Sequence, residues 1–355
     1  MARTPLRADD PSRVGHYRLT ARLGAGGMGV VYLGVSWDGS PVAIKVLRPD
    51  LADSQEFRQR FGREVDALVR VKSACTVRVI EADSQSATPF MVTEYAEGPS
   101  LHEYLTEHGT LSPDMLQDLA TGLAEALTVI HAAGIVHRDL KPSNIILTAS
   151  GPKVIDFGIA RRLDMAGMTK TGMMVGSTGF MAPEQISGQP GREADIFIWG
   201  VTVAYAASGQ SPFGTGNAHA FLYRVMYGEA DIAAVPDLLR PMVRAALTKE
   251  PEGRPTARQL FDRLASLSPR AGTSFNAATQ VTPALVRSEP GRARQAAPPR
   301  PAPEIPAASV PAGSVPAPAR RSSGPLAALG RRAMVITVSA VVLVAAAVIV
   351  AVLLT

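Results

Sequence analysis

The chain has 355 residues, which is enough for one large domain or two ordinary ones, and its formal net charge is +5. The positive charge belongs to residues 268–355, which hold nine arginines, no lysine and two glutamates, whereas residues 1–267 hold 27 basic and 29 acidic residues; this balance gives no indication of a nucleic-acid partner. A single cysteine excludes an internal disulfide framework, and the polar segment of residues 1–14, with two aspartates, is unlike a secretory signal.

Residues 17–35 have the pattern of two strands joined by a glycine-rich turn. The turn reads Gly-Ala-Gly-Gly-Met-Gly from residue 24 to residue 29, and Val30, Val31 and Tyr32 follow it as a run that favours a strand. A dinucleotide-binding glycine motif would run into a helix instead, so that interpretation is disfavoured. Glycines at the tip of a hairpin let main-chain N–H groups approach phosphate oxygens without obstruction by side chains.

A lysine, Lys45, ends the next predicted strand, which reads Val-Ala-Ile-Lys. A lysine at the end of an apolar strand is ordinarily a solvated surface residue, but beside a phosphate-binding hairpin it can pair with the α- and β-phosphates of a nucleotide. A carboxylate would hold its flexible side chain in place. The helical segment of residues 54–71 offers Glu56, Glu64 and Asp66 for this purpose.

The most informative segment reads Val-His-Arg-Asp-Leu-Lys-Pro-Ser-Asn, from residue 136 to residue 144, and Asp-Phe-Gly begins twelve residues later. Asp139 can accept a proton from a hydroxyl group, and Lys141 can neutralise phosphate charge. Asn144 and Asp156 offer an amide and a second carboxylate for magnesium. Transfer of a phosphoryl group from ATP requires this set, and few other reactions need all of it in this order.

In combination these motifs resemble those of protein kinases, and the resemblance covers residues 17–267. It implies an α+β, bilobal fold. A small lobe of antiparallel strands plus one regulatory helix takes about residues 17–95, and a larger, mainly helical lobe takes about residues 96–267. Residues 1–16 are then an N-terminal extension. The lysine in Asp-Leu-Lys-Pro-Ser-Asn resembles that of serine/threonine kinases rather than tyrosine kinases, and the motifs are similar to those of bacterial eukaryotic-like (Hanks-type) kinases.

The resemblance also implies catalytic and metal-binding roles. Asp139 would be the catalytic base, with Lys141 and Lys45 as the other catalytic residues. Asn144 and Asp156 would bind the metal. ATP is the implied phosphate donor and Mg²⁺ the implied metal, for which Mn²⁺ can substitute.

The nucleotide site is implied in the same way. Glu64 is the expected partner of Lys45, and Thr93 would lie at the back of the adenine pocket. Main-chain groups of Glu94 and Ala96 would face adenine. The expected ATP-binding residues are Leu23, Gly24, Ala25, Gly26, Gly27, Met28, Gly29, Val31, Ala43, Lys45, Glu64, Thr93, Glu94 and Ala96.

Residues 156–184 end in Met-Ala-Pro-Glu and resemble a kinase activation segment. Two hydroxyl-bearing residues within it, Thr169 and Thr171, are expected phosphorylation sites, because bacterial serine/threonine kinases carry a similar pair. Without the resemblance, an ordinary polar loop is the alternative. Arg138, directly before the catalytic aspartate, would pair with the added phosphate.

Three further residues are expected to have structural roles. His137 has an apolar setting, which favours a packed and hydrogen-bonded histidine over a catalytic one. Asp195 begins an apolar run that resembles the start of the long central helix of the larger lobe. Arg254 is the implied ion-pair partner of Glu184.

Residues 268–332 are predicted to be a disordered juxtamembrane linker. They hold twelve of the 28 prolines and almost no aromatic residues, so they cannot bury enough apolar surface to offset the entropy of ordering. Residues 333–354 contain only Thr337 and Ser339 as polar members. At about 1.5 Å per residue they would span roughly 33 Å as a transmembrane helix.

Four arginines, at positions 320, 321, 331 and 332, lie on the N-terminal side of this span. The positive-inside rule then predicts a single-pass protein of the cell membrane, with the kinase domain in the cytoplasm. Ala347 and Ala351 give a small-x-x-x-small spacing that could support a homodimer, although this spacing arises easily by chance.

The expected function is ATP- and magnesium-dependent phosphorylation of Ser and Thr on proteins, including the chain's own Thr169 and Thr171. Two alternatives belong to other classes. A membrane-tethered pseudokinase would act as a binding module, although every position whose loss signals an inactive kinase is filled here. A small-molecule phosphotransferase on a related fold would share the base, the amide and the metal carboxylate.

Overall fold

The structure is a computed structural model that describes residues 3–156, 179–188 and 190–267. The chain divides into two compact units, Met1–Ala284 and Leu285–Thr355. All of the described residues lie in the first unit, so the fold described below is that of the first unit alone.

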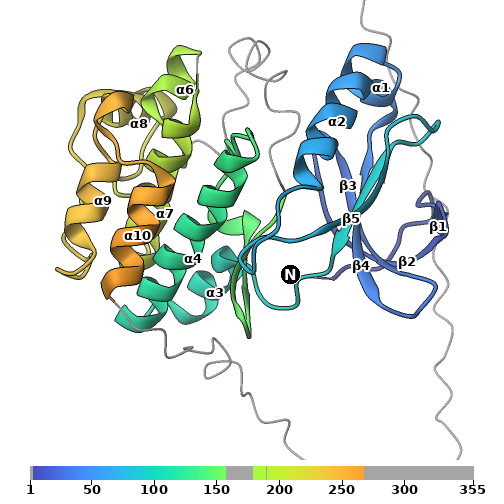
Figure 1. The fold of residues 1–355 in the computed structure, drawn as a ribbon, viewed down its shortest axis with the longest axis horizontal. Coiled ribbons are helices and arrows are strands. Elements are labelled where there is room, and N and C mark those ends of the chain that lie inside the picture. Colours follow the sequence, from blue (N-terminus) through green and yellow to red (C-terminus); the bar gives the residue numbers. More distant parts are fainter. Residues whose placement is uncertain (1–2, 157–178, 189, 268–355) are drawn as a thin grey trace, which may run out of the picture. The chain divides into compact units, whose positions relative to one another are not determined.

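One antiparallel sheet forms the first half of the fold (Figure 1). Its strands are β1 (Arg13–Val14), β2 (Tyr17–Gly26), β3 (Gly29–Val35), β4 (Pro41–Leu47), β5 (Val79–Asp83) and β6 (Phe90–Glu94). They lie in the order β1-β2-β3-β4-β6-β5. The start of β2 alternates between buried Tyr17 and Leu19 and exposed Arg18 and Thr20, which is the period-two pattern of a strand with one face on a core. Glycine is required at Gly29, because a Cβ there would lie 1.9 Å from the main-chain oxygen of the neighbouring strand.

Two helices lie between β4 and β5: the short α1 (Pro49–Ala52) and the longer α2 (Gln55–Leu68). The Ser54 side chain accepts a hydrogen bond from the main-chain N–H of Phe57 and so caps the start of α2. The buried face of α2 consists of Phe57, Phe61, Val65 and Leu68, whose spacing of three or four residues puts them on one side of a helix. Through this face α2 packs against β5 and joins the core.

The second half of the fold is mainly helical. Its helices are α3 (Leu101–His108), α4 (Pro113–Ala132), α6 (Pro183–Ser187), α7 (Arg192–Ser208), α8 (Ala218–Tyr227), α9 (Arg240–Ala246) and α10 (Ala257–Leu267), with the 3₁₀ turns η1 (Pro142–Asn144) and η2 (Pro251–Gly253). A ribbon of two antiparallel strands, β7 (Ile145–Thr148) and β8 (Gly151–Val154), lies beside α4.

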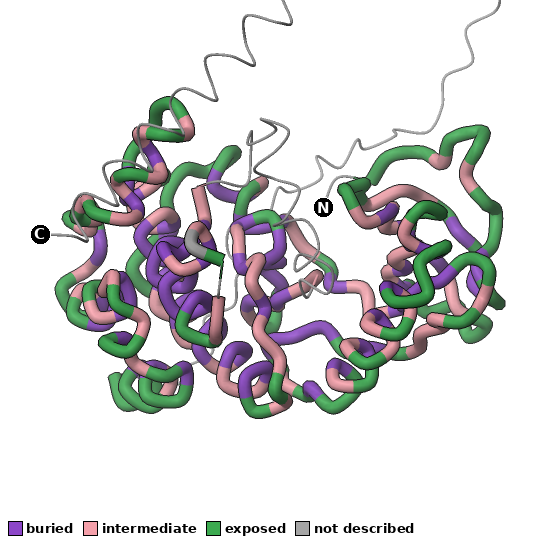
Figure 2. The backbone as a smooth tube through the Cα atoms, turned by 90° about the horizontal axis from the view of Figure 1, so that it is seen from above, coloured by how far each residue is buried: buried purple, intermediate pink, exposed green. Residues whose placement is uncertain are grey.

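Helices α4 and α7 form the centre of this half. The Ser112 side chain caps α4, and Pro113 occupies its first turn. The buried residues of α4 recur at helical spacing. The indole N–H of Trp199, on α7, donates to the carbonyl of Ala120, on α4, at 3.0 Å. Figure 2 shows the buried residues gathered in the interior of the helical half and the exposed residues on its outer turns.

The α+β organisation expected from the sequence is confirmed: an antiparallel sheet with α2 precedes a mainly helical region. The linker of residues 268–332 and the membrane helix of residues 333–354 lie outside the described residues, as do Thr169 and Thr171. Within the described part of the chain, no helix is both long enough and apolar enough to cross a membrane.

Candidate active site

The glycine-rich turn joins β2 to β3, and Gly26 pairs with Gly29 where the two strands close. A Cβ placed on Gly24, Gly26 or Gly27 would have no atom within 4 Å. Side chains at these positions would therefore project into open space, which glycine leaves clear for a ligand to approach the main chain. The turn is a strand-to-strand hairpin, as the sequence predicts, and not the entry to a helix.

Lys45 lies on β4 opposite Val31 of β3, close to the glycine-rich turn. Its ammonium group is 3.9 Å from the sulfur of Met28, at the tip of that turn, and forms an ion pair with the carboxylate of Asp156. The two partners are 111 residues apart in sequence. Asp156 has a left-handed main chain, with φ of +55°. The structure thus brings the hairpin, the strand lysine and the expected metal carboxylate together.

Glu64, the expected partner of Lys45, lies on α2 with one of its carboxylate oxygens buried. Among the described residues, the carboxylate that pairs with Lys45 is that of Asp156 and not that of Glu64. The structure therefore gives the lysine a different anionic partner from the one that the family resemblance implies.

The expected catalytic residues meet just before η1. The Lys141 ammonium group lies 3.0 Å from Oδ2 of Asp139. The side-chain amide of Asn144 donates to the main-chain oxygen of Asp139 at 2.9 Å and to its Oδ2 at 3.1 Å. Two cationic or polar donors therefore hold the Asp139 carboxylate in one orientation, and charge-assisted hydrogen bonds of this kind are the stronger ones.

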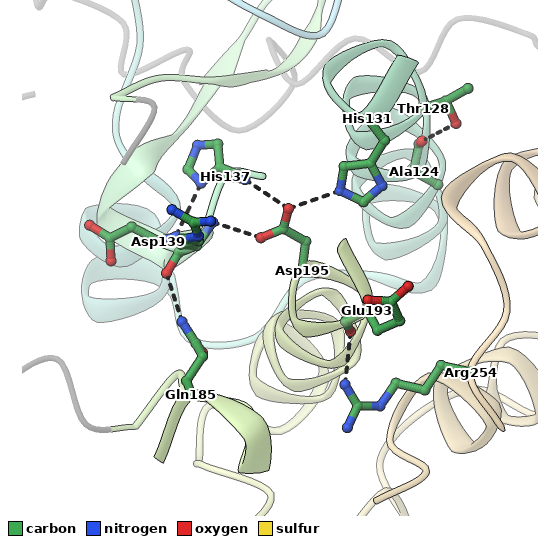
Figure 3. A network of polar contacts seen from close by, with 10 residues as sticks. Ala124, Thr128, His131, His137, Asp139, Gln185, Glu193, Asp195 and Arg254 are labelled. Carbon is green, nitrogen blue, oxygen red and sulfur yellow. Dashed lines mark hydrogen bonds and ion pairs between the residues drawn. The ribbon is translucent and has the colours of Figure 1, made fainter. Parts of the chain in front are cut away.

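The loop that carries Asp139 is held by Asp195, a fully buried residue of α7. Figure 3 shows its carboxylate between this loop and His131. The Asp195 carboxylate accepts hydrogen bonds from the main-chain N–H groups of His137, at 2.8 Å, and Arg138, at 2.7 Å. It also lies 2.8 Å from Nε2 of His131, on α4. Arg138 has φ of +62°, a conformation that non-glycine residues rarely adopt. Asp195 thus stabilises an unusual turn directly before Asp139.

Sequence reasoning assigned Asp195 only to the start of a helix and missed its contact with the catalytic loop. A signal was present, since Asp195 directly precedes the apolar run Ile-Phe-Ile-Trp-Gly-Val. A charge that is buried in such a helix needs partners, and main-chain N–H groups supply them here. The role of His131 had no comparable signal.

His137 is completely buried and packed, as expected. Burial lowers the pKa of this histidine below its ordinary value, although Asp195 and Asp139 oppose the shift. The neutral ring accepts a hydrogen bond at Nδ1 from the main-chain N–H of Asp139 at 3.3 Å. These contacts give His137 a structural role in the loop.

The residues that are expected to face adenine lie where β6 ends. Thr93 pairs with Ala43 across the β4–β6 ladder. Glu94 forms an ion pair with Lys153, on β8, at 2.7 Å, and so connects the end of the sheet to the helical half. The expected adenine-facing residue Ala96 lies two residues after Glu94 and is buried.

The end of the expected activation segment is anchored to the helical half. The Arg254 guanidinium makes two hydrogen bonds to the Glu184 carboxylate, at 2.6 and 3.0 Å, so this predicted ion pair is confirmed. Gln185 donates from its side-chain amide to the carbonyl of Arg138 at 3.2 Å. The segment end and the catalytic loop are therefore in direct contact, which Figure 3 also shows.

The residues expected to bind the metal have the right chemistry for Mg²⁺. Asn144 uses its amide N–H groups on Asp139, which leaves its side-chain oxygen as a hard ligand, and Asp156 supplies a carboxylate. No group of three or more His, Cys, Asp or Glu side chains that could hold a metal ion is found in the part of the chain described here.

Comparison with known proteins gives a consistent result. Residues 17–266 match the protein kinase domain family. The probable serine/threonine-protein kinase PkwA of Thermomonospora curvata is 46% identical over 263 residues, which are 74% of this chain and 35% of PkwA. The serine/threonine-protein kinase AfsK of Streptomyces coelicolor is 42% identical over 262 residues, which are 73% of this chain and 33% of AfsK. This chain thus spans about a third of the length of these curated relatives.

Among solved structures, the PknI kinase domain of Mycobacterium tuberculosis is similar, with a TM-score of 0.55 and 25% sequence identity. The similarity covers 71% of this chain and 95% of the PknI chain.

Proposed function

The chain belongs to the protein kinase family, and on that basis we propose that it transfers the γ-phosphoryl group of ATP to serine and threonine hydroxyl groups of proteins, with Mg²⁺ as cofactor. The observation that carries this proposal is the cluster of Asp139, Lys141 and Asn144, which lies within hydrogen-bonding distance in one loop. Relatives named as serine/threonine-protein kinases support the choice of acceptor.

In this proposal Asp139 orients the acceptor hydroxyl and takes its proton at a carboxylate oxygen. A strong base is not required, because the transition state for phosphoryl transfer is loose and demands orientation more than base strength. Lys141, held 3.0 Å from the same carboxylate, neutralises charge on the transferred group. When bound to Asn144 and Asp156, Mg²⁺ supplies positive charge to the β- and γ-phosphate oxygens.

The remaining residues bind and orient the nucleotide. The open main chain at Gly24, Gly26 and Gly27 donates N–H groups to the phosphates. Lys45 is directed to the same region, as its contact with Met28 at the tip of the turn indicates. The carboxylate that Lys45 contacts, Asp156, is also an expected metal ligand, so this ion pair puts the lysine beside the expected metal position.

Regulation by phosphorylation of Thr169 and Thr171 is part of the proposal. Arg138 lies directly before the catalytic aspartate, and its carbonyl accepts a hydrogen bond from Gln185, the residue that follows the activation segment. A phosphate of about −1.5 to −2 charge on either threonine could therefore pair with Arg138 and order the segment.

The acceptor is proposed to be a protein, not a small molecule. The bidentate ion pair between Glu184 and Arg254 anchors the end of the activation segment. Such an anchor has a purpose in an enzyme that positions a peptide along this segment, and a small-molecule phosphotransferase would not need it.

We also propose that the chain is held at the cell membrane by residues 333–354, with the kinase domain on the cytoplasmic side. The apolar composition of this segment and the arginines that precede it support this proposal. Homodimerisation through Ala347 and Ala351 is proposed on their spacing alone. Extraction of the 355-residue chain with alkaline carbonate, compared with a chain that ends at residue 332, tests the anchor: only the longer chain should stay in the membrane pellet.

The proposed activity is tested by incubating the 355-residue chain, purified in mild detergent, with γ-labelled ATP, Mg²⁺ and a generic protein substrate. Label on phosphoserine and phosphothreonine after hydrolysis of the protein supports the proposal. Label on small acceptors alone would indicate a small-molecule phosphotransferase, and nucleotide binding without transfer would indicate a pseudokinase.

A further inference from the structure

The N-terminal extension is built onto the sheet. The main-chain N–H groups and carbonyls of Thr4 and Arg22 exchange two hydrogen bonds, at 2.8 and 3.0 Å, which pairs this part of the extension with β2. Farther along, β1 pairs with the start of β2, so the extension is attached to the same strand at both ends. Between these points Leu6 packs against the core of the sheet.

A carboxylate in this segment, Asp10, is bonded to the two strands that form the glycine-rich hairpin. The Arg22 guanidinium donates to both Asp10 oxygens, at 2.6 and 2.5 Å, and the Tyr32 hydroxyl donates to one of them at 2.7 Å. The side chain of Asp10 is only 2% exposed and that of Arg22 is 11% exposed. Asp10 also accepts a hydrogen bond from the main-chain N–H of Arg7 at 2.7 Å, so its carboxylate is fully engaged.

This cluster lies at the base of the nucleotide-binding hairpin. Arg22 and Tyr32 face each other in the β2–β3 ladder, and the register shifts immediately beyond them, between Arg22 and Gly24. Leu23, an expected ATP-binding residue, is therefore the irregular residue next to the cluster. The Arg22 guanidinium holds the pKa of the Asp10 carboxyl well below its usual range. Burial and, to a smaller extent, the hydrogen bond to Asp10 raise the pKa of Tyr32 to about 12. The charges of the cluster therefore persist across the working pH range.

The other end of the same segment reaches the adenine side of the site. The Arg3 guanidinium lies 5.2 Å from the centre of the Tyr95 ring and donates to the Tyr95 hydroxyl at 3.2 Å. Tyr95 stands between Glu94 and Ala96, which are expected to face adenine. One continuous segment, residues 3–10, thus contacts both the glycine-rich hairpin and the connection at Tyr95.

We propose that residues 3–10 form an N-terminal strap that braces the glycine-rich hairpin against the connection at Tyr95, and that Asp10 is a positioning residue for ATP. Asp10 does not touch the nucleotide: it acts through Arg22 and Tyr32 on Leu23 and Gly24. The strap raises the affinity for ATP by reducing the freedom that the hairpin loses when it closes on the phosphates. This inference rests on the proposed function, because it requires that the hairpin binds a nucleotide.

The test compares Asp10→Asn with Asp9→Asn in the 355-residue chain. Asp9 is the adjacent, exposed carboxylate, so its replacement makes the same change of charge outside the cluster. The dissociation constant of Mg·ATP is measured by calorimetry, KM for ATP and kcat by a protein phosphorylation assay, and the midpoint of thermal unfolding by scanning calorimetry. For Asp10→Asn we expect the dissociation constant and KM to rise about tenfold and kcat to stay within about twofold, because one charge-assisted contact is lost. Asp9→Asn should match the unmodified chain.

A second variant keeps the test decisive if Asp10→Asn does not fold. Arg3 is at the surface, so Arg3→Gln removes the contact with Tyr95 without opening the core. It should weaken ATP binding by about threefold, as expected for an exposed cation–π contact. Combining Asp10→Asn with Arg22→Gln should weaken ATP binding no more than the stronger single variant does, because both variants remove the same interaction.

The possible results separate the strap from the proposed function. A lower unfolding midpoint for Asp10→Asn with an unchanged dissociation constant for Mg·ATP would overturn the proposal that the strap promotes ATP binding. The ion pair between Asp10 and Arg22 would then contribute to stability alone. An unmodified chain that binds Mg·ATP but phosphorylates nothing contradicts the proposed function, while the change in dissociation constant still decides on the strap. An unmodified chain that does not bind Mg·ATP overturns both.

Discussion

The carboxylate of Asp195 accepts a hydrogen bond from the main-chain N–H of Arg138 at 2.7 Å, so helix α7 holds the residue directly before Asp139. The same carboxylate accepts from the N–H of His137 at 2.8 Å. Since Arg138 has φ of +62°, this turn needs external support, and Asp195 provides it from a completely buried position.

Replacing Asp195 should therefore affect stability and catalysis together. Asp195→Ala leaves two buried main-chain N–H groups without their acceptor, so we expect the free energy of unfolding to fall by about 3 kcal/mol. At temperatures where the variant remains folded, kcat should fall while the dissociation constant of Mg·ATP stays nearly constant. Urea unfolding and steady-state kinetics measure these quantities. The control is Asp237→Ala, which removes a carboxylate whose side chain is 90% exposed and should change the free energy of unfolding by less than about 0.5 kcal/mol. Equal effects of the two variants would contradict this role.

The ion pair between Glu184 and Arg254 should not tolerate lysine. The Arg254 side chain is fully buried and donates to both Glu184 oxygens as well as to three main-chain carbonyls, at residues 193, 248 and 249. Lysine cannot reproduce this fork of donors, so Arg254→Lys should lower the free energy of unfolding by about 2 kcal/mol or more. Arg258→Lys, in an exposed pair with Asp262, is the matched control and should be nearly neutral. If Arg254→Lys is as stable as the control, the anchor is not bidentate in solution.

Whether Lys45 needs Glu64 as well as Asp156 can be tested by kinetics. In the structure Lys45 pairs with Asp156, whereas an active kinase requires the lysine–glutamate pair. Glu64→Gln should therefore lower kcat by about tenfold or more and leave the dissociation constant of Mg·ATP within about twofold. The exposed Glu56→Gln on the same helix serves as control. An unchanged kcat for Glu64→Gln would mean that Lys45 needs no glutamate.

Lys249 should make stability depend on pH in the alkaline range. Burial, followed by the nearby Arg254, lowers the pKa of Lys249 from 10.5 to about 8. Between about pH 8 and pH 10.5 the unfolded chain binds this proton and the folded chain does not, so this group's contribution to stability rises with pH across that window. The difference in free energy of unfolding between the unmodified chain and Lys249→Met should accordingly increase from pH 8 to pH 10 in urea titrations. A flat difference for Lys249→Met across this range would refute the shift.

Sequence patterns predicted those parts of the site in which the chemistry is local. The glycine spacing between two β-rich runs predicts a hairpin, and Asp139, Lys141 and Asn144 come together because they lie within six residues in one loop. The antiparallel sheet, α2 and the helical region follow from periodicity and from the resemblance. Ser54 and Ser112, which cap α2 and α4, are ordinary helix-start signals.

Contacts between distant segments were less predictable, because nothing local encodes them. Asp195 could be assigned to a helix from its neighbours. Its hydrogen bonds to His137 and Arg138 depend on how α7 packs against the loop before Asp139, almost 60 residues earlier in the chain. The ion pair of Lys45 with Asp156 spans 111 residues. Asp10 was used only to argue against a signal peptide, yet it is bonded to two strands of the sheet.

The central claim is that Asp139 is the catalytic base of a protein kinase that phosphorylates its own activation segment. It is tested most directly by incubating the 355-residue chain and its Asp139→Asn variant with Mg²⁺ and ATP and mapping phosphates by mass spectrometry. We predict phosphate on Thr169 or Thr171 in the unmodified chain and none in the variant, although both bind ATP. The same phosphates on both proteins, or ATP binding with no phosphate on either protein or on a generic substrate, would contradict it.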